Sequence, residues 1–289
     1  MYEQSRPLVA LIYDFDGTLS PANMQEFGLI QTIGDNIDHF WQENRTLALR
    51  NDADDVLCYL YRILTTAQNK GIRLTREMFR QFGTKIELYE GVCEWFALIN
   101  SYGESLNLDI RHYIISSGLK EMIEGSPIAG EFENIYACSY LYNDDGTPCW
   151  PAVAVDYTTK TQFIFKINKG IREVSDNKKV NQFVPDEQRP IPFSHMIYFG
   201  DGETDVPCMR MVKERGGHSI AVYGNELKKA TSAHLLHDNR VNFACPADYR
   251  KNSEIHSLVC TILKRIRADI DFDNLKTLHH SRLNDHTTD

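Results

Sequence analysis

Two aspartates near the start of the chain are the residues best placed to do chemistry. Asp14 and Asp16 follow the apolar run 8–13 and precede Gly17 and Thr18. A short apolar run that ends at turn residues is typical of a buried parallel strand, and ligands of open α/β sheets bind beyond the carboxyl ends of such strands. Residues two apart on an extended segment point the same way, so both carboxylates can face one ligand.

The closeness of these two carboxylates restricts what the site can be. Unit charges about 4 Å apart repel by roughly 4 kcal/mol at an effective dielectric constant of about 20, so the pair implies a bound cation or a shared proton. A calcium-binding loop beginning at Asp14 is excluded, because Leu19 stands where its glycine belongs and Gln25 where its glutamate belongs. The alternative is that the two aspartates are solvated residues at the end of a strand, with no chemical role.

Two further apolar runs end in small polar residues. The run 110–115 leads into a Ser-Ser-Gly segment that begins at Ser116, and the run 196–199 leads into a segment that carries Asp201 and Asp205. The carboxyl ends of parallel strands meet at one edge of a sheet, so we expect these polar residues to lie near Asp14.

The rest of the chain alternates between candidate strands and helices. Strands are expected at 219–223 and around 241–244, and an amphipathic helix is expected over 93–102. Apolar residues at helical spacing predict a helical insert over about 20–88, with Thr75 as a helix cap. Together these patterns predict an α/β fold whose doubly wound parallel sheet carries helices on both faces.

Three segments of the second half have a different character. The stretch 132–155 is rich in aromatic and β-branched residues around an Asp-Gly, which predicts a β-hairpin. Residues 177–192 contain three prolines and are expected to form an exposed loop. An amphipathic helix is predicted over 255–266, and 279–289 is expected to be a frayed tail whose histidines (His279, His280 and His286) bind no metal.

Composition excludes several classes of protein. With 289 residues, 42% hydrophobic and 25% charged, the chain is typical of a globular protein. A formal net charge of −9 argues against a nucleic-acid-binding surface. The cysteines are odd in number and include no Cys-x-x-Cys pair, which predicts neither disulfides nor zinc. No apolar stretch approaches the ~20 residues that a membrane span needs, so a cytoplasmic location is expected.

Taken together, the motifs resemble those of a known family. Their order is Asp-x-Asp-Gly-Thr, then serine, then lysine, then Gly-Asp-Gly-x-x-Asp, at Asp14, Asp16, Ser116, Lys160, Asp201 and Asp205. This pattern is similar to that of the haloacid dehalogenase (HAD) superfamily, and in particular of its phosphoserine-phosphatase-like branch. The resemblance covers residues 6 to about 250 and includes the lysine-bearing run 160–166.

The resemblance implies a role for each of these residues. Asp14 would attack phosphorus and form an aspartyl phosphate, and Asp16 would first protonate the leaving oxygen and then deprotonate water. Ser116 would donate its hydroxyl to the phosphoryl group, and Lys160 would stabilise its charge. Substrate phosphate would also bind to a cradle that includes backbone amides, formed by Gly17, Thr18, Ser117 and Gly118. Other lysines nearby, Lys166 and Lys169, are expected to be surface residues.

A divalent cation is part of the same expectation. Four aspartates and a phosphate dianion carry far more negative charge than one lysine can offset, and a site without cysteine or histidine favours Mg²⁺ over zinc. The resemblance implies Asp14, the main-chain carbonyl of Asp16, and Asp201 as ligands. Asp205 is expected to support the metal site by holding a metal-bound water or Lys160.

The resemblance also predicts a division into domains. The HAD-like core would comprise 1–19 and 89–270, the helical cap 20–88 and the C-terminal tail 271–289. The cap would close over the sheet edge and exclude water. Candidate pocket residues in the cap are Met24, Phe27, Trp41 and Arg50. Asn23 stands where phosphoserine-specific members have a glutamate, and Glu26 is out of register with that position.

The sequence therefore predicts an Mg²⁺-dependent phosphatase that acts on a small phosphorylated metabolite. Dehalogenation is disfavoured, because that chemistry has no leaving alkoxide for Asp16 to protonate. Two alternatives stay open. One is a phosphotransferase or nucleotidase with the same nucleophile, and the other is a catalytically silent binding or regulatory protein with the same fold.

Overall fold

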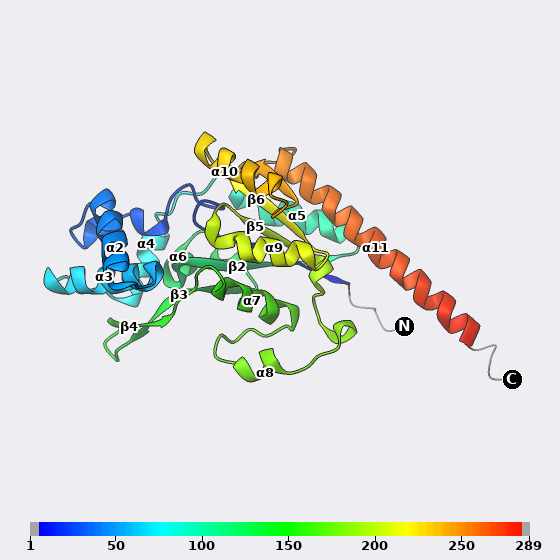
Figure 1. The fold of residues 1–289 in the computed structure, drawn as a ribbon, viewed down its shortest axis with the longest axis horizontal. Helices are drawn as coiled ribbons and strands as arrows, with labels where there is room; N and C mark the ends of the chain where they lie inside the picture. Colours follow the sequence, from blue (N-terminus) through cyan, green and yellow to red (C-terminus); the bar gives the residue numbers. More distant parts are fainter. Residues whose placement is uncertain (1–5, 285–289) are drawn as a thin grey trace.

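A computed structural model describes residues 6–284, which form an α/β fold around one seven-stranded sheet (Figure 1). The strand order is β4-β3-β2-β1-β5-β6-β7, and every neighbouring pair is parallel except β3 and β4. The chain thus builds outward from β1 in both directions, which confirms the predicted doubly wound sheet. The strands are β1 (Leu8–Tyr13), β2 (Asp109–Leu119), β3 (Asn134–Tyr142), β4 (Pro148–Val153), β5 (Met196–Gly200), β6 (His218–Tyr223) and β7 (Phe243–Pro246).

Helices cover both faces of this sheet. On one face α5 (Val92–Ser105) contacts α11 (Glu254–Asn284), and on the other α7 (Thr159–Asn168) contacts α9 (Val206–Glu214). The crossovers from β2 to β3 and from β6 to β7 contain α6 (Lys120–Gly125) and α10 (Glu226–His237). Burial on both faces explains why the first strand is a continuous apolar run, and residues 9–13 of β1 have no exposed surface.

The segment 20–88 is helical, as predicted. It contains η1 (Met24–Glu26), α1 (Leu29–Thr32), α2 (Ile37–Asn51), α3 (Asp55–Asn69) and α4 (Arg76–Gly83). Thr75 caps α4, since its hydroxyl accepts a hydrogen bond from the Met78 amide. The helix α4 packs closely against α6. The division of the chain into a core and a cap stays a prediction.

The predicted hairpin is formed by β3 and β4. The turn between them closes with a hydrogen bond from the Asn143 amide to the Thr147 carbonyl, and Gly146 has a φ of 77°, which favours glycine. Asp145 accepts a hydrogen bond from the Thr147 amide, as expected of a turn residue. The hairpin extends the sheet at the edge beside α3.

The structure corrects three expectations in the rest of the chain. The strand β2 continues past Ser116 to Leu119, with a shift in register that bends its end. Lys166 is buried, because the carbonyl oxygens of Glu173 and Asp176 accept hydrogen bonds from its ammonium group, so the surface assignment was wrong. The expected loop 177–192 includes two short helices, α8 (Asn177–Asn181) and η3 (Asp186–Gln188).

The C-terminal segment also differs from the prediction. The apolar residues expected to pack in 255–266 are buried, except that Leu258 is partly so, but α11 does not end there and continues to Asn284. The frayed tail predicted from His279 is therefore wrong as far as Asn284, and His286 lies outside the described residues. No helix within 6–284 combines the length and the apolar character that crossing a membrane requires.

Candidate active site

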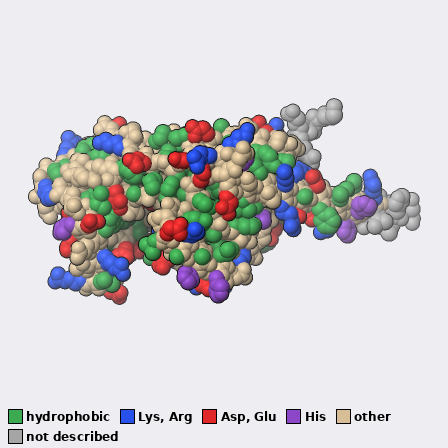
Figure 2. Space-filling view, turned by 90° about the horizontal axis from the view of Figure 1, so that it is seen from above, with side chains coloured by type: hydrophobic (Ala, Val, Ile, Leu, Met, Phe, Trp, Pro, Cys, Tyr) green, Lys and Arg blue, Asp and Glu red, His purple; other side chains and the backbone are tan. Residues whose placement is uncertain are grey.

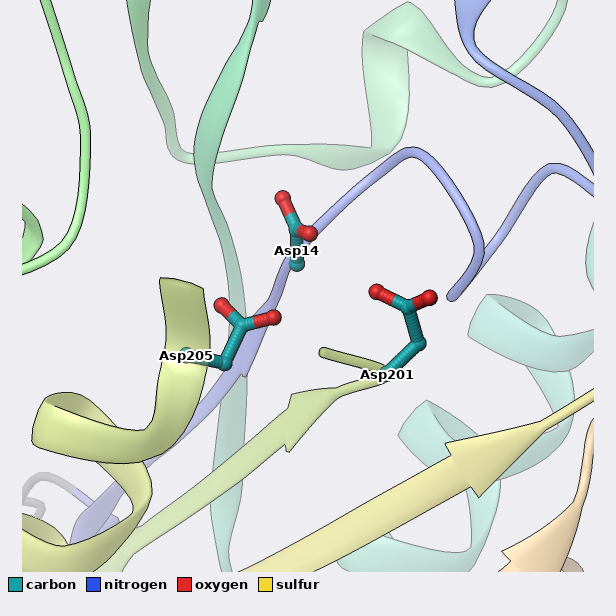
Figure 3. Close-up of side chains that lie close together, drawn as sticks. All are labelled: Asp14, Asp201 and Asp205. Carbon is teal, nitrogen blue, oxygen red and sulfur yellow. The ribbon is translucent and has the colours of Figure 1, made fainter. Parts of the chain in front are cut away.

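Three carboxylates converge at the carboxyl edge of the sheet. Asp14 follows β1, Asp201 follows the neighbouring β5, and Asp205 ends η5 (Glu203–Asp205) before α9. One oxygen from each lies within 4.8 Å of the others, and all three residues are buried (Figure 3). Adjacent parallel strands that end side by side explain why residues so distant in sequence meet here.

A buried lysine completes this cluster. Lys160 lies in the first turn of α7 and has no exposed surface. Its Nζ is 3.1 Å from Oδ1 of Asp14 and 2.8 Å from Oδ1 of Asp205. Burial by itself lowers the pKa of Lys160, but the two carboxylates outweigh it and raise that pKa above its ordinary value. The ammonium group therefore stays charged inside the protein.

The aspartates of the site are held in an environment that disfavours their charge. Burial, reinforced by Asp205, raises the pKa of Asp14 to about 8, although Lys160 opposes the shift. Burial, together with the charge of Asp14, raises the pKa of Asp16 well above its usual range. Burial also raises the pKa of Asp201. One lysine is thus too little positive charge for this cluster.

The donor set fits a hard divalent cation such as Mg²⁺. Oδ2 of Asp205 is buried and has no hydrogen-bond partner among the described residues, and Oδ1 of Asp14 is buried with the 3.1 Å ion pair to Lys160 but no hydrogen bond. A buried carboxylate oxygen without a partner is costly, and a cation is a means of satisfying it. All of the converging atoms are carboxylate oxygens, which Mg²⁺ and Ca²⁺ prefer over nitrogen or sulfur.

Asp16 lies apart from this trio. Its Oδ1 accepts a hydrogen bond of 2.9 Å from the amide of Met24, at the start of the helical insert. Gly17, which follows it, has a φ of 77°, and a Cβ atom there would lie 2.1 Å from Oδ2 of Asp201. Only glycine therefore lets the chain turn away from the strand so close to Asp201. Asp14, Asp16 and Gly17 all line the same cavity.

The predicted serines lie at the end of β2. Ser116 is buried and Ser117 partly so, and both line the cavity. The hydroxyl oxygen of Ser116 accepts a hydrogen bond of 3.0 Å from the amide of Gly118, so its own hydrogen stays available to a ligand. A Cβ atom on Gly118 would lie 2.1 Å from Cε of Met24, so the end of that flexible side chain would have to shift to admit one.

Several of the predicted phosphate-binding amides are already engaged within the chain. The Gly17 amide donates to the Ser20 carbonyl at 2.7 Å, and the Thr18 amide donates to the Phe15 carbonyl at 3.3 Å. Thr18 is fully buried, and neither it nor Gly118 lines the cavity. Of the four residues predicted for phosphate binding, the structure therefore brings Gly17 and Ser117 to the cavity.

The cavity has a volume of about 980 Å³ and lies between the sheet edge and the helices α2 and α3. Trp41 lines it, as predicted for the insert. Met24 is instead buried beneath Gly118, and Phe27 and Arg50 do not line the cavity. The remaining wall from α2 includes Asn44 and Arg45, which sequence reasoning did not single out. The side of a helix that faces a cavity depends on how the helix packs, which residue spacing alone does not specify.

Three other residues of the wall were not assigned a role from sequence. Lys228 on α10 places its Nζ 2.7 Å from Oδ2 of Asp201. The Tyr59 hydroxyl on α3 donates a hydrogen bond of 2.6 Å to the Ser117 carbonyl. Glu26 was noted only as out of register, and its carboxylate is held by the Trp41 indole and the Asn23 amide group at 2.9 and 2.7 Å. No local sequence signal identifies the first two, because long-range packing brings them to the site.

A cluster of buried acids around a buried lysine lies at the carboxyl edge of a doubly wound sheet and beneath a helical insert, where such folds bind their ligands. The family model of haloacid dehalogenase-like hydrolases matches residues 11–210, well over half of the chain. The protein therefore belongs to this family, as its motifs predict.

The chain is also similar to individual proteins. An uncharacterized protein of Borreliella burgdorferi is 30% identical over 282 residues, which covers 87% of this chain and 95% of that one. A substrate-bound phosphoserine phosphatase aligns with a TM-score of 0.52 at 14% identity, over 84% of this chain and 93% of its own. Cytosolic 5'-nucleotidase IIIB bound to cytidine gives the same TM-score at 14% identity, over 92% and 87%. These two solved structures share the fold of this protein.

Proposed function

We propose that this protein is an Mg²⁺-dependent phosphomonoester hydrolase of the phosphoserine-phosphatase-like branch. It would act on a small phosphorylated metabolite through an aspartyl phosphate on Asp14. The observation that carries the proposal is the convergence of Asp14, Asp201 and Asp205 around the buried Lys160. Membership in a hydrolase family supports it.

The first half-reaction transfers the phosphoryl group to the protein. A carboxylate oxygen of Asp14 attacks phosphorus, the bond from phosphorus to the ester oxygen breaks, and the leaving oxygen takes a proton from Asp16. Asp16 suits this role because burial and the charge of Asp14 raise the pKa of its carboxyl group well above its usual range, which favours the protonated form.

The second half-reaction restores the protein. Asp16, now ionised, takes a proton from a water molecule as that water attacks the phosphorus of the aspartyl phosphate. The bond between phosphorus and the Asp14 oxygen breaks, inorganic phosphate leaves, and both aspartates return to their starting states. Splitting the hydrolysis into two displacements lets one pair of carboxyl groups serve both.

Other groups hold the phosphoryl oxygens. The free hydroxyl hydrogen of Ser116 would donate to one oxygen, and Lys160 would offset the charge that gathers near Asp14. A divalent cation held by Asp14, Asp201 and the main-chain carbonyl of Asp16, with Asp205 in support, would supply further positive charge against the phosphate dianion.

The test is hydrolysis of p-nitrophenyl phosphate with Mg²⁺ or with EDTA. We expect Mg²⁺-dependent phosphate release from the wild type and none from Asp14→Asn. Asp52→Asn is the matched control, because Asp52 is an exposed acid on the cavity wall, outside the trio, and its variant should stay active. Acid quenching during turnover should trap a hydroxylamine-sensitive phosphoprotein in the wild type and in Asp52→Asn, but not in Asp14→Asn.

Three outcomes would contradict the proposal. Activity that survives in Asp14→Asn would show that Asp14 is not the nucleophile. Transfer of phosphate to an added alcohol in preference to water would identify a phosphotransferase. No turnover across a broad panel of phosphorylated metabolites, including phosphoserine and nucleoside monophosphates, would favour a binding protein with this fold.

A further inference from the structure

The second half of α11 projects from the body of the protein. Its first half packs on the sheet, and Ile266 is its last fully packed residue, with 2% of its surface exposed. Beyond it Ile270 still packs partly against the core, and the helix then extends away from the other elements, as both the ribbon and the space-filling view show (Figures 1 and 2). At about 1.5 Å per residue, the stretch 267–284 is about 27 Å long.

This projecting stretch carries an apolar face. Phe272, Leu275 and Leu278 are 58%, 55% and 44% exposed. Residues three apart fall on one side of a helix, within an arc of about 120° for these three. A lone helix of this length is only marginally stable in water, and an exposed apolar face indicates an interaction site. Both properties favour a binding partner for this stretch.

Charge along the same stretch is divided into two blocks. The middle residue of the apolar face is Leu275. Three acids come before it, Asp269, Asp271 and Asp273, and two bases come after it, Lys276 and Arg282. Asp271 pairs with Arg267 on its own helix but is 59% exposed. Arg282 has no ion-pair partner among residues 6–284. An acidic block followed by a basic block is complementary to a copy of itself that runs in the opposite direction.

We propose that the projecting half of α11 is a self-association surface, which pairs antiparallel with α11 of a second copy of this chain. Centred between Leu275 and Leu278, the pairing brings Leu275 of each copy against Leu278 of the other. The same register sets Asp271 against Arg282, and both contacts occur twice by two-fold symmetry. A parallel pair would instead set Asp271 against Asp271, which disfavours it.

The length of the stretch is compatible with this register. Asn284, where the described helix ends, falls opposite Asp269 of the second copy. That position lies beyond Ile266, where the buried part of the helix ends. The two helices can therefore overlap along the whole projecting stretch without either one reaching the packed half of the other.

Sedimentation velocity over a range of protein concentrations tests the proposal. We expect the wild type to form a reversible dimer and Leu275→Asp to remain a monomer. Leu227→Asp is the matched control, because Leu227 is 79% exposed on α10, and this variant should associate like the wild type. A monomeric wild type at every concentration would overturn the proposal and leave the face to another partner, and so would an unimpaired Leu275→Asp.

A charge exchange tests the direction of the pairing. Asp271→Arg and Arg282→Glu each place like charges together twice in the dimer, so each should raise the dissociation constant about tenfold. The double variant restores both pairs in an antiparallel dimer and should recover wild-type association. A double variant that associates no better than the two single variants would overturn the antiparallel register. Circular dichroism checks that each variant keeps its helix content.

Discussion

Replacing Lys160 with methionine should destabilise the metal-free protein strongly. Methionine keeps most of the length of the side chain but leaves the carboxylates of Asp14 and Asp205 without their cation in a fully buried site. Asp205 retains one hydrogen bond, from the Tyr198 hydroxyl at 2.7 Å, whereas Oδ1 of Asp14 has no such partner among the described residues. Breaking a buried ion pair by removing one member costs about 3–5 kcal/mol, and we expect a loss of that size.

An exposed ion pair in the same site provides the control. Lys228 lies 2.7 Å from Oδ2 of Asp201, as close as Lys160 lies to Asp205, but 43% of its side chain is exposed. Solvent screens such a pair, so Lys228→Met should cost at most about 1 kcal/mol. The free energies of unfolding of the two variants, measured with urea in EDTA, therefore show the effect of burial on two ion pairs of nearly equal distance.

The loss in Lys160→Met should also depend on pH. Without the ammonium group, the already raised pKa of Asp14 rises further. A carboxyl group whose pKa is higher in the folded than in the unfolded state contributes stability that is lost as pH rises through the folded pKa. The deficit relative to wild type should therefore grow as pH rises through about 8, and be larger at about pH 9 than at about pH 6. Equal losses in the two variants, or a deficit independent of pH, would refute a charged lysine buried between two carboxylates.

Two further predictions concern the contacts of the helical insert. A Cβ atom on Gly83 would lie 2.0 Å from the Met122 carbonyl oxygen, so Gly83→Ala should cost about 1–3 kcal/mol in urea unfolding. Gly130→Ala, which meets no atom within 4 Å, should be near neutral. The hydrogen bond with Asp54, together with burial, raises the pKa of Asp156 to about 6, so stability from this shared proton is lost as pH rises through that value. Asp156→Asn should flatten the melting temperature between about pH 4 and pH 6, and an unchanged profile would contradict the pairing.

The sheet was predictable because its signal is local. The central strand is buried on both faces, so it must be apolar throughout, and the chain must leave it through small or polar residues. These features can be recognised from consecutive residues of the sequence. Because parallel strands end at a common edge, the positions of Asp14 and Asp201 followed from that pattern alone.

The environment of individual lysines was less predictable. Lys160 and Lys166 lie on one helix and both are buried, yet one contacts carboxylates and the other main-chain carbonyls of the segment that follows. The sequence identified Lys160 as a site residue only through the motif around it. The second depends on how residues 173–176 fold back, and Lys228 depends on how α10 docks beside β6. Such partners are set by contacts between distant segments, which residue periodicity does not encode.

For the two aspartates of the first motif, Asp14 and Asp16, one part of the arrangement was predictable from sequence and another part was not. Alternation on a strand predicted that they would face one ligand, and both do line the cavity. However, β1 ends at Tyr13, and the turn at Gly17 sends the Asp16 carboxyl group to the Met24 amide, away from Lys160. Asp14 therefore lies beside a fixed cation that favours its charge, whereas no such cation opposes the raised pKa of Asp16. A nucleophile must be ionised and a general acid must hold its proton. Lys160 lowers the pKa of Asp14, but burial still leaves it at about 8, so the divalent cation proposed at this site would have to lower it further before Asp14 attacks.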